Sequence, residues 1–450
     1  MNTLALRSKQ KYWRLFFFCL LCLAVAFATT LADAAPVQSA PTLREFWVWD
    51  LSVMPPAFRK TTATLRASGN RTLIYVEDKF FGHEITADYV TRLEYQLERS
   101  VPSGAYITDT GIVPLEERIF GPLPTKIAKD DRLVVLFAAL GQYKDVQFDG
   151  FFNLYDQLPE SEAMQKYQQH SNEANVIYLN GFRKSETYTT GVIAHELQHL
   201  LASGTTEVSR ESWLSESLAE GAMLLTGFFS DQDHVDKYLS ETGKYPLVTS
   251  GYVQYGPQLL FSSFLADSLP SARDMTAIAS LNRVELGGRD AVEKLYQDLT
   301  EAPLSFDAIF SNFVSYVFEQ SAGGAALPNS WRHSPAIHVL QIAPFFTYQA
   351  GSGELTGELA PYSFVAVDLA QELSPSAEIQ VTRIPPSPGQ TNASGCARDA
   401  SVLWKPVNKT RIAIYAVGCD PGEKPEDVQF RLRILDQPSL LPASPFKLLR

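Results

Sequence analysis

The run HELQHL, from His195 to Leu200, places two imidazoles and a carboxylate on one turn of a predicted helix. On a helix of about 3.6 residues per turn, Glu196 lies roughly 100° and His199 roughly 40° around the axis from His195, so the three share one face. The opposite face carries the apolar residues Ile193, Leu197, Leu200 and Leu201. We therefore expect an amphipathic helix that exposes its polar face and anchors its apolar one.

This spacing suits a zinc ion. Imidazoles at positions i and i+4 have Cβ atoms about 5 to 6 Å apart, a separation from which both rings can bind one Zn²⁺ at Zn–N distances near 2.1 Å. Bound zinc lowers the pKa of water to about 7, so Glu196 is expected to act as the base that takes the proton and passes it to a leaving amine. His195 and His199 are thus predicted ligands of one catalytic ion.

A third ligand is expected from the acidic helix that follows, because a catalytic zinc needs three protein ligands and one open position. The segment ESWLSESLAE offers Glu216 and Glu220, one turn apart. Glu216 is the expected ligand, since it follows Trp213 and Leu214 at the start of the helix and can point back across the loop. Glu220 is then the acceptor that orients one histidine; the reverse assignment stays open.

These two segments resemble the gluzincin group of zinc peptidases, and most closely the hyicolysin-like neutral metallopeptidases. In that family Ala-His-Glu-Phe-Gln-His is followed by Trp-Leu-Asn-Glu-Gly-Leu, and this chain has AHELQH and WLSESL. Further similar stretches are LIYVED, FGPLPTKIAKDDRLVVLF and DGFFNLYDQ, so the resemblance covers about residues 42–300. It implies a zinc endopeptidase fold with His195, His199 and Glu216 as ligands and Glu196 as base.

The chain departs from the family pattern beside the third ligand. Ser215 stands where the family commonly has Asn, and Ser217 stands where it usually has Gly. Neither change removes a ligand, but a side chain at position 217 narrows the space expected beside the metal.

An oxyanion formed during hydrolysis needs a hydrogen-bond donor besides the metal, and gluzincins take it from a downstream Tyr or His. Tyr255 is the main candidate, because it precedes a Gly-Pro pair and a new apolar helix. Tyr252 and His234 are alternatives. The same pattern is equally consistent with a Tyr255 that only packs in the interior and has no catalytic role.

The amino terminus has the form of a secretory signal. Four basic residues precede the apolar run LFFFCLLCLAVAFATTLA, and Ala32-Asp33-Ala34 resembles a signal peptidase site. We expect residues 1–34 to be removed and the mature protein to be secreted or periplasmic; an uncleaved anchor is the alternative. Of the cysteines beyond the signal, Cys396 and Cys419 are expected to form one disulfide.

Charge limits the classes of partner. The net charge is −12, and removal of residues 1–34 takes away four basic residues and one acidic, which leaves −15. Such a surface disfavours nucleic acid and anionic membranes. The expected partner is a protein or peptide substrate, without membrane insertion after signal cleavage. The sequence does not indicate an oligomeric state.

Hydrophobic patterning predicts an α+β fold in three parts. Strand-like runs alternate with polar helical stretches in residues 35–180, amphipathic helices fill residues 181–345, and residues 346–450 read as a small β-sandwich. The first two parts would form a zincin-like domain, a mixed-sheet lobe and a helical lobe with the site between them. Residues 149–154 are a candidate edge strand for binding extended substrate, and residues 321–331 a linker.

The leading hypothesis is a secreted or periplasmic zinc endopeptidase. An exported binding or adhesion protein with an inactive zincin fold is the alternative from another class. An aminopeptidase is the second enzymatic alternative, although no acidic motif that would hold a free amino terminus precedes HELQHL.

Overall fold

The computed structural model provides the geometry of most of the chain after residue 41. The described residues are 42–103, 105–125, 130–143, 146–182, 184–204, 212–229, 232–249, 254–269, 278, 280–281, 287–300, 303–323, 342–349, 353–373, 377–385, 400–418 and 427–435. The expected signal segment, Tyr252, Cys396 and Cys419 lie outside them, as does most of the expected linker.

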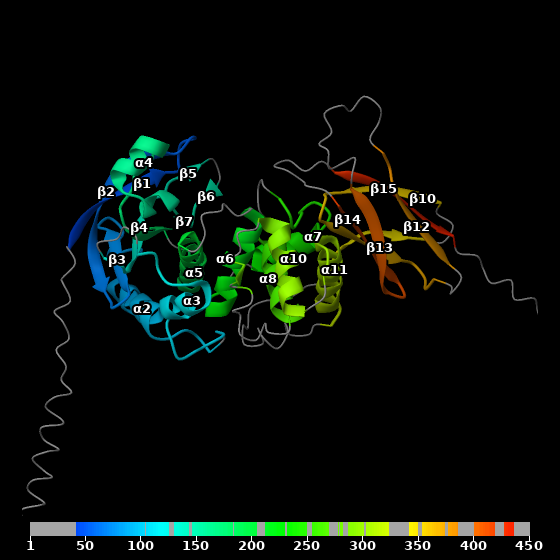
Figure 1. Ribbon diagram of the computed structural model, residues 1–450, viewed down its shortest axis with the longest axis horizontal. Helices are drawn as coiled ribbons and strands as arrows, with labels where there is room; N and C mark the ends of the chain where they lie inside the picture. The colour runs from blue at the N-terminus through cyan, green and yellow to red at the C-terminus, as the bar shows by residue number, and fades with distance from the viewer. Residues whose placement is uncertain are drawn as a thin grey trace, which may run out of the picture. The chain divides into compact units, whose positions relative to one another are not determined.

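A six-stranded mixed sheet forms the first part of the fold (Figure 1). Its strands, in spatial order, are β1 (Leu43–Asp50), β2 (Ala57–Ser68), β3 (Thr72–Glu77), β4 (Leu133–Ala138), β8 (Asn175–Asn180) and β7 (Gly150–Phe152). The central pairs β3–β4 and β4–β8 are parallel, whereas β1, β2 and β7 join antiparallel. A short hairpin, β5 (Gln142–Tyr143) and β6 (Val146–Gln147), leads into β7.

The three central strands are buried along their whole length, which explains their continuous apolar sequences. One face packs on the helices α2 (Ala87–Glu98), α3 (Ile112–Phe120) and α5 (Glu186–Ser203). On the other face, η1 (Leu154–Gln157) contacts β8, and α4 (Glu160–Tyr167) follows η1 in the chain. Thus α5, which carries the HELQHL run, is supported by a rigid sheet.

Helices make up the second part. Those among the described residues are α6 (Ser212–Thr226), α7 (Gln232–Ser240), α8 (Gly256–Ser268), α10 (Gly288–Thr300) and α11 (Phe306–Gly323). Helix α6 contacts both α5 and α8, and α8 contacts α7 and α11. Their apolar residues belong to the same hydrophobic cluster as the helix-covered face of the sheet, so the two parts share one core.

Two smaller sheets follow. One is β13 (Ser401–Asn408), β14 (Arg411–Val417), β11 (Phe364–Leu369) and β9 (Pro344–Tyr348); the other is β10 (Glu354–Leu359), β15 (Val428–Leu435) and β12 (Glu378–Arg383). Alternate residues of β11 divide between two clusters: Phe364 and Ala366 join the helical core, whereas Val365 and Val367 pack with residues of the other sheet. In β15, by contrast, buried and exposed residues alternate.

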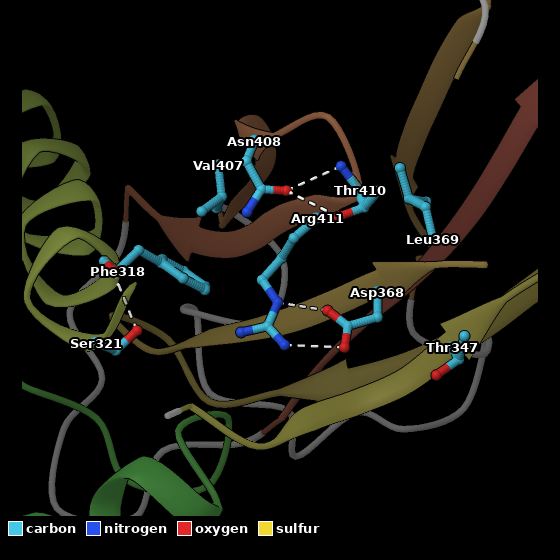
Figure 2. Close-up of a pocket in the computed structure, with 9 residues that line it drawn as sticks. All are labelled: Phe318, Ser321, Thr347, Asp368, Leu369, Val407, Asn408, Thr410 and Arg411. Carbon is cyan, nitrogen blue, oxygen red and sulfur yellow. Dashed lines mark hydrogen bonds and ion pairs between the residues drawn. The ribbon is translucent and has the colours of Figure 1, made fainter. Parts of the chain in front are cut away.

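Helix α11 meets the four-stranded sheet at a polar cavity of about 460 Å³. Figure 2 shows Arg411 beside Asp368 there, with the guanidinium donating to both carboxylate oxygens. Asn408 Oδ1 accepts from the backbone N–H of Thr410 at 2.9 Å. The charged groups of this cavity therefore pair with each other, and we assign it no chemistry.

The fold is mixed α and β with a mixed sheet and additional small sheets, so the predicted class is correct at that level. Strands β11 and β14 are buried on both faces, because helices cover the side that does not face the other sheet. Among the described helices, none is both long and apolar enough to span a bilayer.

A buried acid near the second face of the sheet gives a pH test. Asp156 accepts hydrogen bonds from Tyr178 Oη at 2.5 Å and from the N–H of Asn172 at 2.6 Å. Burial raises the pKa of Asp156 to about 7 although these bonds oppose the shift. Because an unfolded Asp has a pKa of about 3.9, folding favours the protonated form, and this stabilisation is lost as the pH rises from about 4 to about 7.

We predict that Asp156→Asn, which mimics the protonated acid, becomes progressively more stable relative to the unmodified protein between pH 4 and pH 8. Denaturant unfolding at several pH values measures the difference in unfolding free energy. Gln165→Ala, at an exposed and non-titrating position of α4, is the control and should leave that difference flat. A flat difference for Asp156→Asn as well would contradict the pKa assigned to Asp156.

Candidate metal centre

Helix α5 brings the HELQHL residues into the interior. Ser185 caps its first turn by accepting the N–H of Tyr188 at 3.1 Å, and Gly204 follows its last residue. The sequence predicted an open polar face, and this is wrong: His195 and Glu196 are each only 8% exposed, and Gln198 is fully buried. The reason is that the sheet, α3 and α6 all pack against α5.

Three side chains converge at the middle of α5. The Nε2 atoms of His195 and His199 lie 3.2 Å apart, and Glu216 Oε2 lies 3.1 Å from the first and 3.6 Å from the second. A tetrahedral ion with bonds of about 2.0 to 2.1 Å holds its ligand atoms about 3.3 Å apart. The observed separations bracket that value, so this cluster could hold a metal ion.

Close packing of α5 and α6 sets the position of Glu216. A Cβ on Gly191, one turn before His195, would lie 2.4 Å from the carbonyl oxygen of Phe228, just after α6. A Cβ on Gly221 would lie 2.5 Å from Ser262 Oγ on α8. Glycine at position 191 therefore lets α5 approach the end of α6, and glycine at position 221 lets α6 approach α8. The first of these contacts brings Glu216 within reach of both imidazoles.

A second layer orients the imidazoles. The Nδ1 atom of His195 lies 3.2 Å from Glu220 Oε1, and the Nδ1 atom of His199 lies 3.2 Å from Ser215 Oγ. An Nδ1–H that donates to these oxygens leaves the Nε2 lone pair free for a metal. Glu220 thus lies where the sequence placed a second-layer acceptor. The Ser215 contact was not predicted, although its position next to Glu216 on the same helix could have suggested it.

Glu196 lies beside this cluster against the edge strand β7. The backbone N–H of Phe152 donates to its carboxylate. A Cβ on Gly150 would lie 2.8 Å from Val192 Cγ1 and 3.4 Å from Glu196 Cγ, so glycine allows β7 to approach α5. Burial raises the pKa of Glu196, and the positive charges of His195 and His199 oppose that rise.

Buried groups of opposite charge face each other in this cluster. Burial opposes ionisation of Glu216, but the charges and hydrogen bonds of His199 and His195 hold its pKa well below the usual value. Burial likewise opposes protonation of His195, yet its hydrogen bonds to Glu216 and Glu220 raise the imidazole pKa well above normal. An anionic Glu216 therefore faces a proton on His195, and a metal ion bound to the neutral imidazole would take the place of that proton.

One buried carboxyl group near the centre was missed. Glu116, on α3, is fully buried, and neither of its oxygens has a hydrogen-bond partner among the described residues. Burial raises its pKa well above normal, and it is close enough to His195 for the imidazole charge to oppose that rise. No sequence pattern indicated it, because Glu116 belongs to a helix that lies far along the chain from the HELQHL run.

The candidate hydrogen-bond donors to the oxyanion, Tyr255 and His234, occupy different positions relative to the metal cluster. Tyr255 is the residue before α8, and its ring centroid lies 6.1 Å from that of His195. His234 packs edge-on against Tyr255, with ring centroids 5.3 Å apart. Tyr255 thus contacts both His234 and a residue of the metal cluster.

Comparison with known proteins adds no identification. No protein-family model matches the chain, and no curated protein matches it either. Arguments about function therefore depend on the geometry described above.

We predict that Ser215→Ala weakens binding of Zn²⁺ or Co²⁺ by about tenfold or more, because His199 loses the acceptor that orients it. Competition titration with a chromogenic chelator measures this affinity. Ser217→Ala is the matched control, since Ser217 is on the same helix but its Oγ donates to the carbonyl oxygen of Trp213 instead. Equal affinities in the two variants would contradict the role given to Ser215.

Proposed function

We propose that this protein is a zinc-dependent endopeptidase. The observation that supports the proposal is the convergence of His195 Nε2, His199 Nε2 and Glu216 Oε2, with the carboxylate of Glu196 beside them. Two imidazoles and one carboxylate are a ligand set typical of catalytic zinc, which keeps its fourth position open. The resemblance of both motif segments to gluzincins, and the zincin-like layout that it implies, agree with this interpretation.

Zinc, when bound, supplies a Lewis acid that acidifies water to a pKa near 7 and polarises a carbonyl group. Glu196 is the residue that takes the proton from the attacking water and returns it to the leaving amine. Its surroundings support that role. Burial raises the pKa of Glu196 toward neutral pH, where a carboxylate can both accept a proton and release it again. The N–H of Phe152 fixes the orientation of this carboxylate.

Tyr255 is proposed as the hydrogen-bond donor to the oxyanion. Its position near His195 supports this role, as does its positive φ of 71°, which is rare for a residue other than glycine. Unusual backbone conformations of this kind concentrate at functional sites.

Substrate binding is proposed at the free edge of β7. This strand is the last of the six-stranded sheet and, among the described strands, pairs only with β8, so its outer edge offers backbone groups to an extended chain. Because β7 also contacts Glu196, a peptide that pairs with it would pass beside the catalytic carboxylate. An extended peptide is what an endopeptidase cleaves, and secretion or export to the periplasm, proposed from the amino-terminal signal, gives access to such substrates.

We predict that Glu196→Gln lowers kcat for casein by about 10² to 10⁴, because the amide cannot accept a proton, while zinc content stays near one ion per chain. Metal analysis and a fluorescent casein assay, with and without chelator, measure both quantities. Glu162→Gln serves as the control and should be fully active. Chelator-insensitive activity, or zinc bound without any proteolysis in the unmodified protein, would favour the alternative of an inactive binding or adhesion protein.

A second prediction separates the endopeptidase from the aminopeptidase alternative. Peptides of eight or more residues with an acetylated amino terminus should be cleaved as fast as their free counterparts, because no group in this centre is assigned to a terminal amine. Mass spectrometry of the products locates the cleaved bonds. Cleavage confined to free peptides, with loss of the first residue, would identify an aminopeptidase.

A further inference from the structure

The backbone around Tyr255 is held in an unusual conformation. Its φ of 71° lies in a region that L-residues other than glycine rarely adopt, and its ψ is −40°. Such a conformation persists only where the surrounding structure fixes it on both sides. The groups that fix it are therefore as important as the tyrosine itself.

Gln254 holds one side. Its side-chain Nε2 donates to the carbonyl oxygen of His234 at 3.0 Å, and its Oε1 accepts the N–H of Gly256 at 3.1 Å. The imidazole Nδ1 of His234 lies 2.9 Å from the carbonyl oxygen of Gln254. Gln254 is 3% exposed, so these bonds are shielded from water. Together they tie α7 to the peptide groups on both sides of Tyr255.

Gly256 and the start of α8 hold the other side. A Cβ at position 256 would lie 2.4 Å from the carbonyl oxygen of His234 and 2.7 Å from Gln254 Oε1, so only glycine allows this approach. The N–H of Leu259 donates to the carbonyl oxygen of Tyr255 at 2.9 Å, which is the first hydrogen bond of α8. Tyr255 is thus fixed by α7 before it and by α8 after it.

We propose that His234, Gln254 and Gly256 form a clamp that positions Tyr255 beside His195. The inference rests on the proposed function, because it gives the clamp the task of aiming the tyrosine hydroxyl at the oxyanion. His234 and Gln254 are positioning residues: they act through Tyr255 and do not contact the substrate. The alternative is that the same bonds only stabilise the start of α8.

Kinetics of peptide hydrolysis distinguish these roles. The test variants are Gln254→Leu, which removes both side-chain bonds at similar size, and His234→Leu. We expect each to lower kcat by about tenfold with KM unchanged, less than the roughly 10²-fold loss expected for Tyr255→Phe. His234→Asn should keep most of the activity, because the amide nitrogen can replace Nδ1. Lys237→Gln, at an exposed position of the same helix, is the control and should behave as the unmodified protein.

A double variant tests whether the clamp acts through the tyrosine. In a Tyr255→Phe background, Gln254→Leu should cause no further loss of kcat, because the group that it positions is already gone. Hydrogen exchange of the metal-free protein gives a readout that needs no activity. The amides of Gly256 and Leu259 should exchange about tenfold faster in Gln254→Leu, with the unfolding midpoint of the whole protein little changed.

The outcomes separate the two proposals. The clamp proposal would be overturned if the losses of kcat in the double variant were the product of the single losses, or if amide exchange became faster without any change in kcat. Either result would leave the peptidase proposal intact. Unchanged exchange at Gly256 and Leu259 would also overturn the clamp proposal. If the unmodified protein bound zinc and cleaved no peptide, both proposals would fall together.

Discussion

The structure depends on the close pairing of α5 with α6. A carboxylate on one helix must reach two imidazoles on the other, and Glu216 Oε2 does so at 3.1 and 3.6 Å. Buried ligand atoms this close to one another are stable only when opposite charges compensate, because each group has lost its hydrating water. The glycine at position 191 permits the approach, and the buried Trp213 and Leu218 of α6 anchor that helix in the core.

Burial of the centre has a cost that its second layer offsets. The Nδ1 atom of each imidazole lies within hydrogen-bonding distance of a side chain of α6, and the carboxylate of Glu196 accepts a hydrogen bond from the N–H of Phe152 in β7. The centre is therefore assembled from three elements that are distant in the sequence or separated by a loop. Glu116 adds a buried carboxyl group from a fourth element, α3, and raises the number of acidic groups around His195.

Much of the fold could be predicted from local patterns. The continuous apolar runs at β3, β4 and β8 indicated buried strands, and the 3.6-residue periodicity of α10 and α11 indicated helices. The polar-rich β2 and the strand β13, which contains Pro406, were not predicted as strands. The double burial of β11 could not be foreseen, because it depends on helices that lie more than forty residues earlier in the chain.

The sequence by itself determined that His195 and His199 lie side by side, since a spacing of four residues on a helix brings two side chains together whatever surrounds them. Only the tertiary structure decided that Glu216 reaches both Nε2 atoms while Glu220 meets an Nδ1, that Ser215 holds His199, and that the polar face of α5 is buried. The physical reason is that periodicity fixes neighbours within a helix, whereas neighbours between helices depend on how whole surfaces pack.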